Sequence, residues 1–326
     1  MSDIRIMESA GSWLDRWDEH IERSVNGTLF HLRRFLAYHG DRFRDSERLL
    51  LALNGDTVIA QIAVAITDGP TGRHLRSPYG ASYGGFAFQR YPTFTQACRI
   101  VDAFLAWCQE QGVTKAAITP PIAACSTAPL DVAHFALLHR GFRSVNRELS
   151  SIVALDPTVT VDASVTSRAR NQARRATRAG VTIERGADID AFWSVIAATF
   201  EQHGTQPTHT LEEFRWLTEA LPGRVCVDVA YWQDEPVAGI GYFVINRLVN
   251  SSFYLCQRPE RRDLGGLTLC LLRGLERARE DGYPWFDFGT STVQMHPREN
   301  VFRFKEQFSP AGQFRETFEW TREQVR

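Results

Sequence analysis

A short basic and glycine-rich stretch stands between a strand-like segment and a long amphipathic one. It reads RRDLGG and contains Arg261, Arg262, Gly265 and Gly266. Glycine lets a backbone approach a ligand closely, and a helix that begins there directs its N–H groups at an anion. These residues predict binding of a phosphate-bearing cofactor. The alternative is an ordinary loop before a helix, since Asp263 opposes an anion and Leu267 adds bulk.

A second basic segment lies about 90 residues earlier in the chain. Arg170, Arg174 and Arg178 are spaced i, i+4 and i+8, so they share one stripe of a helix, and Arg168 and Arg175 stand beside them. No acidic residue interrupts the segment, whereas exposed helices normally mix both signs of charge. The stripe predicts contact with the phosphates of a tRNA, a nucleotide-linked acceptor or coenzyme A. The alternative is a solvated helix paired with acids elsewhere.

Two residues have side chains that suit proton transfer. Asp287 ends an apolar strand-like stretch and precedes Gly289, where α/β units place reactive groups. Its carboxylate can orient or deprotonate an amine, or alternatively hold the following turn. His203 is the histidine best placed to act as a base, because its loop, whose Thr205 is a candidate acceptor-binding residue, resembles a substrate loop, although loop histidines are usually inert.

Candidate acceptor-binding residues come from two places. The stretch 77–85 contains Tyr83 and Gly84 and offers backbone amides and phenols that can line an acceptor cleft. Tyr254 lies in a strand-like stretch and directs its hydroxyl either into a cleft or into the core. Glycine- and tyrosine-rich loops also often serve only to turn the chain.

The elements that must position these residues are clearest in the second half of the chain. Strand patterns cover 225–232, 237–245 and 249–256. The Gly-Gly loop and a helix follow, with Leu264, Leu267, Leu271, Leu275 and Ala278 on one face and Gly282 at its end. A buried strand at 285–288 completes the set.

The first half repeats this order. Strand patterns at 49–53 and 57–66 flank the hairpin signal Asn54-Gly55-Asp56, a helix follows with an apolar face between 97 and 108, and a short strand covers 116–119. Helical segments precede both halves, at 12–21, 32–38, 166–178 and 191–200. We therefore predict a duplicated unit and two domains, 1–157 and 158–326, joined at the polar segment 156–162.

The composition excludes several classes of protein. A chain of 326 residues is long enough for two domains, and its net charge of −1 gives no global attraction for polyanions. The six cysteines form no CxxC pair and no metal-ligand spacing with histidine, which favours free thiols in a reducing, cytoplasmic protein. We expect no bound metal, no signal peptide and no membrane span, because no apolar run approaches the roughly 20 residues that a span needs.

The loop around RRDLGG resembles motif A of the GNAT superfamily, P-x-x-R-G-x-G-x-G/A. Pro259, Arg262 and Gly265 fit this motif, whereas Asp263 replaces a glycine and Leu267 replaces the last small residue. In that superfamily the loop binds the pyrophosphate of coenzyme A. The resemblance implies the same role for Arg262, Gly265 and Gly266.

The order of further segments resembles the Fem-type peptidyltransferases, in which two GNAT-like domains pack together. The matching segments are NGTLFH at 26–31, YGG at 83–85, RNQARRATRAG at 170–180, GTQP at 204–207, FDFG at 286–289 and FRFKEQF at 302–308. The resemblance implies that Phe304 and Lys305 line the site where donor and acceptor meet, with an ammonium that stabilises charge on the reacting carbonyl. The alternation of Phe302, Phe304 and Phe308 itself predicts a strand, and a lysine that snorkels to the surface is the alternative.

We therefore expect an α/β (α+β) protein with two tandem GNAT-like domains, each a mixed, mostly antiparallel sheet flanked by helices. The expected enzyme is an N-acyltransferase in which an amine attacks an activated donor directly, without a covalent enzyme intermediate or a tightly bound cofactor. The resemblance slightly favours aminoacyl-tRNA as donor, and acyl-coenzyme A or an acyl carrier protein is the alternative. We expect the acceptor to be a small-molecule or peptide amine. A non-catalytic binding module with the same fold is a further alternative. The chain has no strong candidate for the coiled-coil arm of some Fem enzymes.

Overall fold

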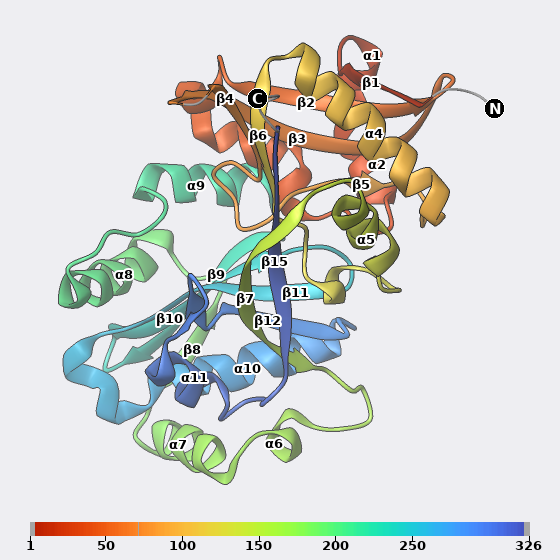
Figure 1. Cartoon of the computed structure of the whole chain (residues 1–326). Coiled ribbons are helices and arrows are strands. Elements are labelled where there is room, and N and C mark those ends of the chain that lie inside the picture. The colour runs from red at the N-terminus through yellow and green to blue at the C-terminus, as the bar shows by residue number, and fades with distance from the viewer. Residues whose placement is uncertain (1–3, 71, 323–326) are drawn as a thin grey trace. The chain divides into compact units, whose positions relative to one another are not determined.

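The computed structural model describes residues 4–70 and 72–322 (Figure 1). The chain forms two compact units: unit 1 is Met1–Glu148 with Phe314–Arg326, and unit 2 is Leu149–Gln313. The chain passes from unit 1 to unit 2 within β7 (Arg143–Ala154) and returns within β15 (Gly312–Thr321). The division into domains at residues 157 and 158 stays a prediction.

The sheet of unit 2 is mixed and mostly antiparallel. Its strands follow the order β7, β12 (Trp285–Thr290), β11 (Val249–Gln257), β10 (Glu235–Val244), β9 (Val225–Trp232) and β8 (Thr182–Arg185). Among the described strands of this sheet, only β11 and β12 run parallel, and their pairing extends from Val249 opposite Trp285 to Ser251 opposite Asp287. Because β11 continues to Gln257, the two strands part at Ser251.

Helices cover both faces of this sheet. On one face, Ala238, Ile240 and Tyr242 share a core with α6 (Val161–Ser164), α7 (Ser167–Arg178) and α10 (Gly266–Glu280). On the other face, α8 (Ile189–His203) is followed by α9 (Leu211–Ala220). A Cβ added at Gly239 would lie 2.7 Å from Phe192 Cδ2, so the strand requires glycine where α8 packs on it.

Unit 1 contains the same succession of elements. Its sheet follows the order β1 (Ile4–Glu8), β2 (Glu47–Asn54), β3 (Thr57–Gly69), β4 (Gly72–Ser77), β6 (Val113–Ile118) and β15, and β5 (Ala87–Phe88) pairs with β3. β4 and β6 are parallel and are joined through α4 (Phe94–Glu110), as β11 and β12 are joined through α10. The expected pair of GNAT-like sheets flanked by helices is confirmed.

The remaining helices of unit 1 are short. They are α1 (Ser12–Asp15), α2 (Trp17–Arg23), α3 (Arg33–Leu36) with 3-10 turns at Ala37–Phe43, and α5 (Asp131–His139). The predicted helices at 12–21 and 32–38 are therefore each interrupted, at Arg16 and after Leu36. Gly40 has φ 54° inside the 3-10 turns, which ends regular helix there.

The predicted strand at 302–308 is wrong. These residues begin in α11 (Glu299–Lys305), which follows the small hairpin of β13 (Thr292–Val293) and β14 (His296–Pro297). Phe304 and Phe308 are four residues apart, their ring centroids lie 5.6 Å from each other, and Phe308 is buried. The i, i+4 spacing of these two rings fits the helix that is observed, whereas the i, i+2 spacing of Phe302 and Phe304 had suggested a strand.

Candidate active site

The predicted catalytic residues Asp287 and Lys305 both contact the end of β12. Lys305 is 5% exposed, and its Nζ donates to the carbonyl oxygens of Gly289 at 2.8 Å and Thr290 at 2.9 Å. Asp287 is 4% exposed, and its Oδ1 accepts from Ser150 Oγ at 2.5 Å and from the Gly289 amide at 2.8 Å. A buried carboxylate and a buried ammonium thus both hydrogen-bond to the last residues of β12.

Buried hydroxyl groups surround the end of β12. Ser251 Oγ donates to the carbonyl oxygen of Asp287 at 2.9 Å, and the hydroxyl oxygens of Ser151 and Ser291 lie 2.7 Å apart. Together with Ser150, these side chains come from β7, β11 and the segment after β12, and all are buried. Hydrogen bonds in such a low-dielectric setting fix the direction of the Asp287 carboxylate.

Two buried polar atoms of β11 have no hydrogen-bond partner within the described part of the chain. They are Asn250 Oδ1 and Ser252 Oγ. Both stand where β11 and β12 part, next to the last paired residue, Ser251. A buried polar atom without a partner is costly, so these atoms are suited to hydrogen bonding with a bound molecule.

The glycine-rich loop before α10 is covered by α7. Gly265 has φ 73°, and a Cβ added there would lie 2.8 Å from Gln172 Cγ. Arg175 of α7 donates to the carbonyl oxygen of Asp263 at 2.7 Å. The side chain of Leu267 is 6% exposed and belongs to the core, so the expectation that its bulk obstructs the loop is wrong. The loop is covered by Gln172 and Arg175 of α7 instead.

The arginines of this loop are already engaged with protein groups. Arg262 donates to Gln202 Oε1. Arg261 forms an ion pair with Glu235 at 3.2 Å, and its guanidinium lies 5.1 Å from the ring centroid of Trp232. An incoming phosphate would have to compete with these partners.

The arginines of α7 fall into two groups. Ala169, Ala173 and Ala176 face the core, which directs the arginines outward. Arg170 donates to the carbonyl oxygen of Asp162 at 2.5 Å, and Arg174 lies 3.5 Å from the Asp162 carboxylate. Asp162 precedes the helix, so it does not interrupt the basic segment, but it pairs with part of the stripe, as the alternative of a helix paired with acids elsewhere expects. Two further arginines, Arg168 and Arg178, are exposed and have no ion-pair or hydrogen-bond partner among residues 4–70 and 72–322.

Tyr254 is buried rather than directed at solvent. It is 5% exposed, its hydroxyl accepts from the His209 amide at 3.1 Å and lies 2.9 Å from His209 Nδ1, and burial raises the pKa of Tyr254 to about 12. His209, missed in the sequence, is 3% exposed and lies among the rings of Phe214, Phe243 and Phe253. Thr205 is exposed just after α8. The side chain of His203 lies outside the part that the structure describes.

Tyr83 and Gly84 belong to the packed interior of unit 1. Tyr83 is 2% exposed and meets Phe30 edge to face at 4.9 Å, and the Gly84 amide donates to the carbonyl oxygen of Thr119 at 2.8 Å. Asn26 bridges the chain nearby, because its side chain donates to the Phe86 carbonyl oxygen at 2.8 Å and accepts from the Phe88 amide. The segments 26–31 and 83–85 therefore pack in one region, and their role in acceptor binding stays a prediction.

His31 in the same region predicts a pH-dependent stability. Burial lowers the pKa of His31 from 6.5 to about 4. Between these two pH values, His31 is therefore protonated in the unfolded chain and neutral in the folded chain. The free energy of unfolding is therefore greatest above pH 6.5 and decreases by about 3 kcal/mol as the pH falls toward 4. Urea unfolding at several pH values should show a smaller pH dependence in His31→Gln than in the wild type. An equal pH dependence of the free energy of unfolding in the two proteins would contradict this role of His31.

The described ranges also lack some features. Within them, no three histidine, cysteine, aspartate or glutamate side chains are grouped so as to hold a metal ion. Among the same residues, no helix combines the length and apolar character needed to cross a membrane. None of the six cysteines, all of which lie in the described ranges, forms a disulfide bond.

Comparisons with known proteins agree with this fold. Residues 163–306 match the family model of the acetyltransferase (GNAT) domain. The crystal structure of FemX is 13% identical, with 97% of each chain covered and a TM-score of 0.72. The structure of L-PGS from Bacillus licheniformis is 14% identical, with 94% of this chain and 90% of that chain covered and a TM-score of 0.60. No curated protein matches the sequence.

A third solved structure supports the duplication. The tandem GNAT protein from the clavulanic acid biosynthesis pathway is 12% identical, with 99% of this chain and 100% of that chain covered and a TM-score of 0.53. At such low identities these structures establish the fold alone. The tandem, Fem-like arrangement of GNAT sheets expected from the sequence is confirmed.

Proposed function

We propose that this N-acyltransferase, whose residues 163–306 form a domain of the GNAT superfamily, transfers an aminoacyl group from aminoacyl-tRNA to an amine. The amine nitrogen attacks the ester carbonyl, an amide bond forms, and the ester C–O bond to the tRNA breaks. The GNAT domain supports acyl transfer in general. The choice of donor rests on the contrast between the covered glycine loop and the exposed arginines of α7.

Asp287 and Lys305 are the proposed catalytic pair. The Asp287 carboxylate would take the proton that the attacking amine loses, because a base near the reacting nitrogen accelerates such steps. The positive charge of Lys305 would stabilise the negative charge that develops on the carbonyl oxygen. The support is their common place at the end of β12, where β11 and β12 part.

The donor argument begins with the loop before α10. An anion binds a helix N-terminus when the first N–H groups are accessible. Here Gly265 and Gly266 are buried, Gln172 packs on Gly265, and Arg262 is engaged with Gln202. These contacts disfavour the pyrophosphate of coenzyme A at this place.

The exposed face of α7 suits a longer polyanion. Arg168 and Arg178 bring positive charge to solvent, and guanidinium groups bind phosphates well. Because Asp162 already balances part of the stripe, we expect a small number of phosphate contacts. A tRNA donor agrees with the cytoplasmic location predicted from the free thiols.

Acyl-coenzyme A, or an acyl carrier protein, is the second candidate donor. The match to the acetyltransferase (GNAT) domain family favours it, as does the start of α10 directly after Gly265. For coenzyme A to bind, α7 would have to move away from the loop.

Calorimetry separates the two donors. We expect no heat from acetyl-coenzyme A at about 1 mM, a concentration that would reveal any site of useful affinity. We expect a charged tRNA to bind, with an affinity that falls as salt rises. Binding of acetyl-coenzyme A that is lost in Arg262→Glu would contradict the proposed donor and support the second one.

The arginines of α7 provide a sharper test of the same donor. The logarithm of the affinity for tRNA falls as the logarithm of the salt concentration rises. In Arg178→Gln this dependence should become less steep by about 1, because one phosphate contact is lost. Arg247→Gln is the matched control, since Arg247 is an exposed arginine of unit 2 in the turn between β10 and β11. Equal slopes in wild type and Arg178→Gln would remove α7 from the donor site.

A further inference from the structure

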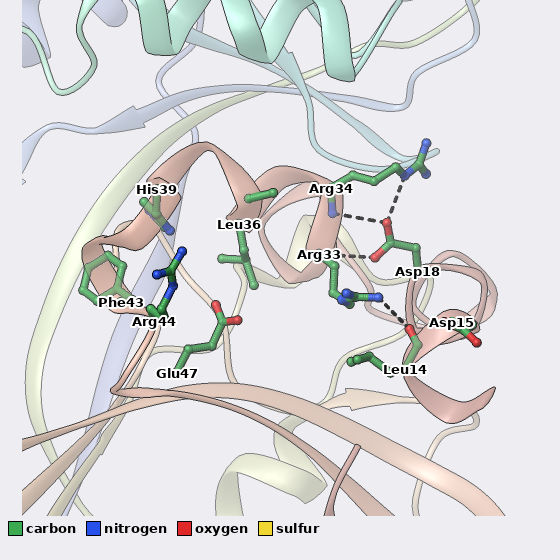
Figure 2. A pocket seen from close by; sticks show the side chains of 12 residues that line it. Leu14, Asp15, Asp18, Arg33, Arg34, Leu36, His39, Phe43, Arg44 and Glu47 are labelled. Carbon is green, nitrogen blue, oxygen red and sulfur yellow. Dashed lines mark hydrogen bonds and ion pairs between the residues drawn. The ribbon is translucent and has the colours of Figure 1, made fainter. Parts of the chain in front are cut away.

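A hollow between the short helices of unit 1 is lined by polar groups that hold the helices together. Its volume is about 540 Å³. Asp18 of α2 accepts from the Arg33 amide at 2.6 Å and from Arg34 Nε at 2.9 Å. The side chain of Arg33 donates to the carbonyl oxygen of Leu14 at 2.9 Å (Figure 2). These contacts join α1 and α2 to α3, so they explain the charges without a ligand. Unit 2 has a surface of a different kind, close to the proposed catalytic pair.

A bulge in the pairing of β10 and β11 redirects an aromatic side chain. The register of the two strands shifts between Gly241 and Tyr242, at the place where Phe253 stands on β11. The ring of Phe253 stacks on Phe243, with centroids 4.3 Å apart, and meets the Tyr254 ring edge to face at 5.0 Å. Bulges are common next to active sites, where they change the direction of a side chain.

Phe253 and Asp287 lie on the same face of the sheet. Ser251 is paired with Asp287 of β12 and also with Phe243 of β10, and paired residues direct their side chains to one face. The ring of Phe253 stacks on Phe243, so it belongs to this face too. Strands lie about 4.8 Å apart and two residues span about 6.7 Å, which places the Cα atoms of Phe253 and Asp287 about 8 Å from each other.

The ring of Phe253 is rigid and partly open. It is partly exposed, whereas its neighbours Phe243 and Tyr254 are buried. The His209 ring lies 5.3 Å from it, and the His209 amide holds the Tyr254 hydroxyl at 3.1 Å. An apolar surface that is already fixed gains free energy when a ligand covers it and loses little conformational entropy. Such a ring is suited to bind an apolar group.

We propose that the acceptor amine carries an apolar group, of about the size of a leucine side chain, which lies on the ring of Phe253. The inference rests on the proposed function, because the amine nitrogen is placed beside Asp287, the residue that takes its proton. Phe253 then determines specificity and has no part in the proton transfer. An acceptor without an apolar group leaves the ring in contact with water and gains no affinity from it.

Calorimetry with two amines tests the proposal on the full-length protein without a donor. L-leucinamide and glycinamide both have a primary amine and an amide and differ in the apolar side chain. L-leucinamide should bind at least about tenfold more tightly than glycinamide, because its side chain leaves water. Equal affinities, or no heat from L-leucinamide at about 10 mM, would overturn the proposal.

Variants locate the binding. Phe253→Thr removes the ring but keeps a β-branched residue that suits a strand, so it should abolish the preference for L-leucinamide and leave glycinamide unchanged. Phe253→Leu keeps an apolar surface and should restore the preference. Phe314→Thr is the matched control, since Phe314 is a phenylalanine of β15 that is 58% exposed, and it should bind as the wild type. An unchanged preference in Phe253→Thr would overturn the proposal.

Thermal unfolding verifies that each variant is folded, and a second measurement needs only the wild type. In protein with labelled phenylalanine rings, L-leucinamide should shift the NMR resonances of Phe253, which Phe253→Leu assigns, and glycinamide should not. Binding of L-leucinamide without any shift of the Phe253 resonances would also overturn the proposal.

The transfer reaction separates this inference from the proposed donor. Transfer from aminoacyl-tRNA at equal rates to low, equal concentrations of L-leucinamide and glycinamide would overturn the apolar subsite and leave the donor supported. Preferential binding of L-leucinamide that depends on Phe253, without transfer from aminoacyl-tRNA, would contradict the donor and support the apolar subsite.

Discussion

Replacing Lys305 with methionine is expected to lower the free energy of unfolding by about 3–6 kcal/mol. The side chain is buried, and its ammonium donates to the carbonyl oxygens of Gly289 and Thr290. Each hydrogen bond from a charged donor contributes about 1.5–3 kcal/mol, and methionine supplies neither of them. The carbonyl oxygens would remain close to the core without these donors. Urea unfolding of wild type and variant measures the difference.

Arg303→Met is the matched control for this experiment. Arg303 lies on the same helix, α11, but is exposed, so its replacement should change stability by no more than about 0.5 kcal/mol. A loss below about 1 kcal/mol in Lys305→Met would mean that the ammonium does not hold the end of β12. Lys305 would then be kept for its charge alone.

The strands β9, β10 and β11 were predictable because their signals are local. The predicted strand at 225–232 coincides with β9, and the predicted ends of β10 and β11 differ from the observed ones by at most two residues. Alternating apolar residues and short polar turns specify such a meander without distant contacts. The largest of these differences concerns Glu235 and Pro236, which belong to β10, because Gln233 and Asp234 adopt positive φ and complete the turn by themselves.

Other strands depend on partners that the sequence does not reveal. β4 reads GRHLRS, a mostly polar sequence in which Leu75 is the buried hydrophobic residue. It becomes a strand because β3 pairs with it on one side and β6 on the other. Propensity is a weak guide for such segments, since cross-strand neighbours supply the stabilisation.

The candidate site likewise depends on distant contacts that the local sequence does not reveal. Asp287 and Lys305 were identified because their neighbouring residues form recognisable segments. Ser150, by contrast, lies 137 residues from its partner Asp287, and nothing in the local sequence joins them. The cover on Gly265 comes in the same way from Gln172, on a helix that precedes the whole meander. Distant contacts of this kind decide whether a loop is open and how a carboxylate is oriented.

Replacing Asp287 with asparagine is expected to lower the rate of transfer by about 10²–10⁴-fold, because the variant loses a proton acceptor. The amide oxygen of asparagine can still accept from Ser150 and from the Gly289 amide, so the turn and the stability should be retained to within about 1 kcal/mol. This separates the variant from Lys305→Met, whose main effect is on stability. The rate is measured in a single turnover with labelled aminoacyl-tRNA and excess amine.

Ser150→Ala gives the intermediate case. It removes one hydrogen-bond donor from the carboxylate but leaves its charge, so the rate should fall by about tenfold and should be restored by Ser150→Thr. If Asp287→Asn transfers as fast as the wild type, Asp287 serves only to hold the turn after β12, which is the structural alternative for this carboxylate. The proton would then leave through the substrate, and the enzyme's contribution would consist of alignment and of the positive charge of Lys305.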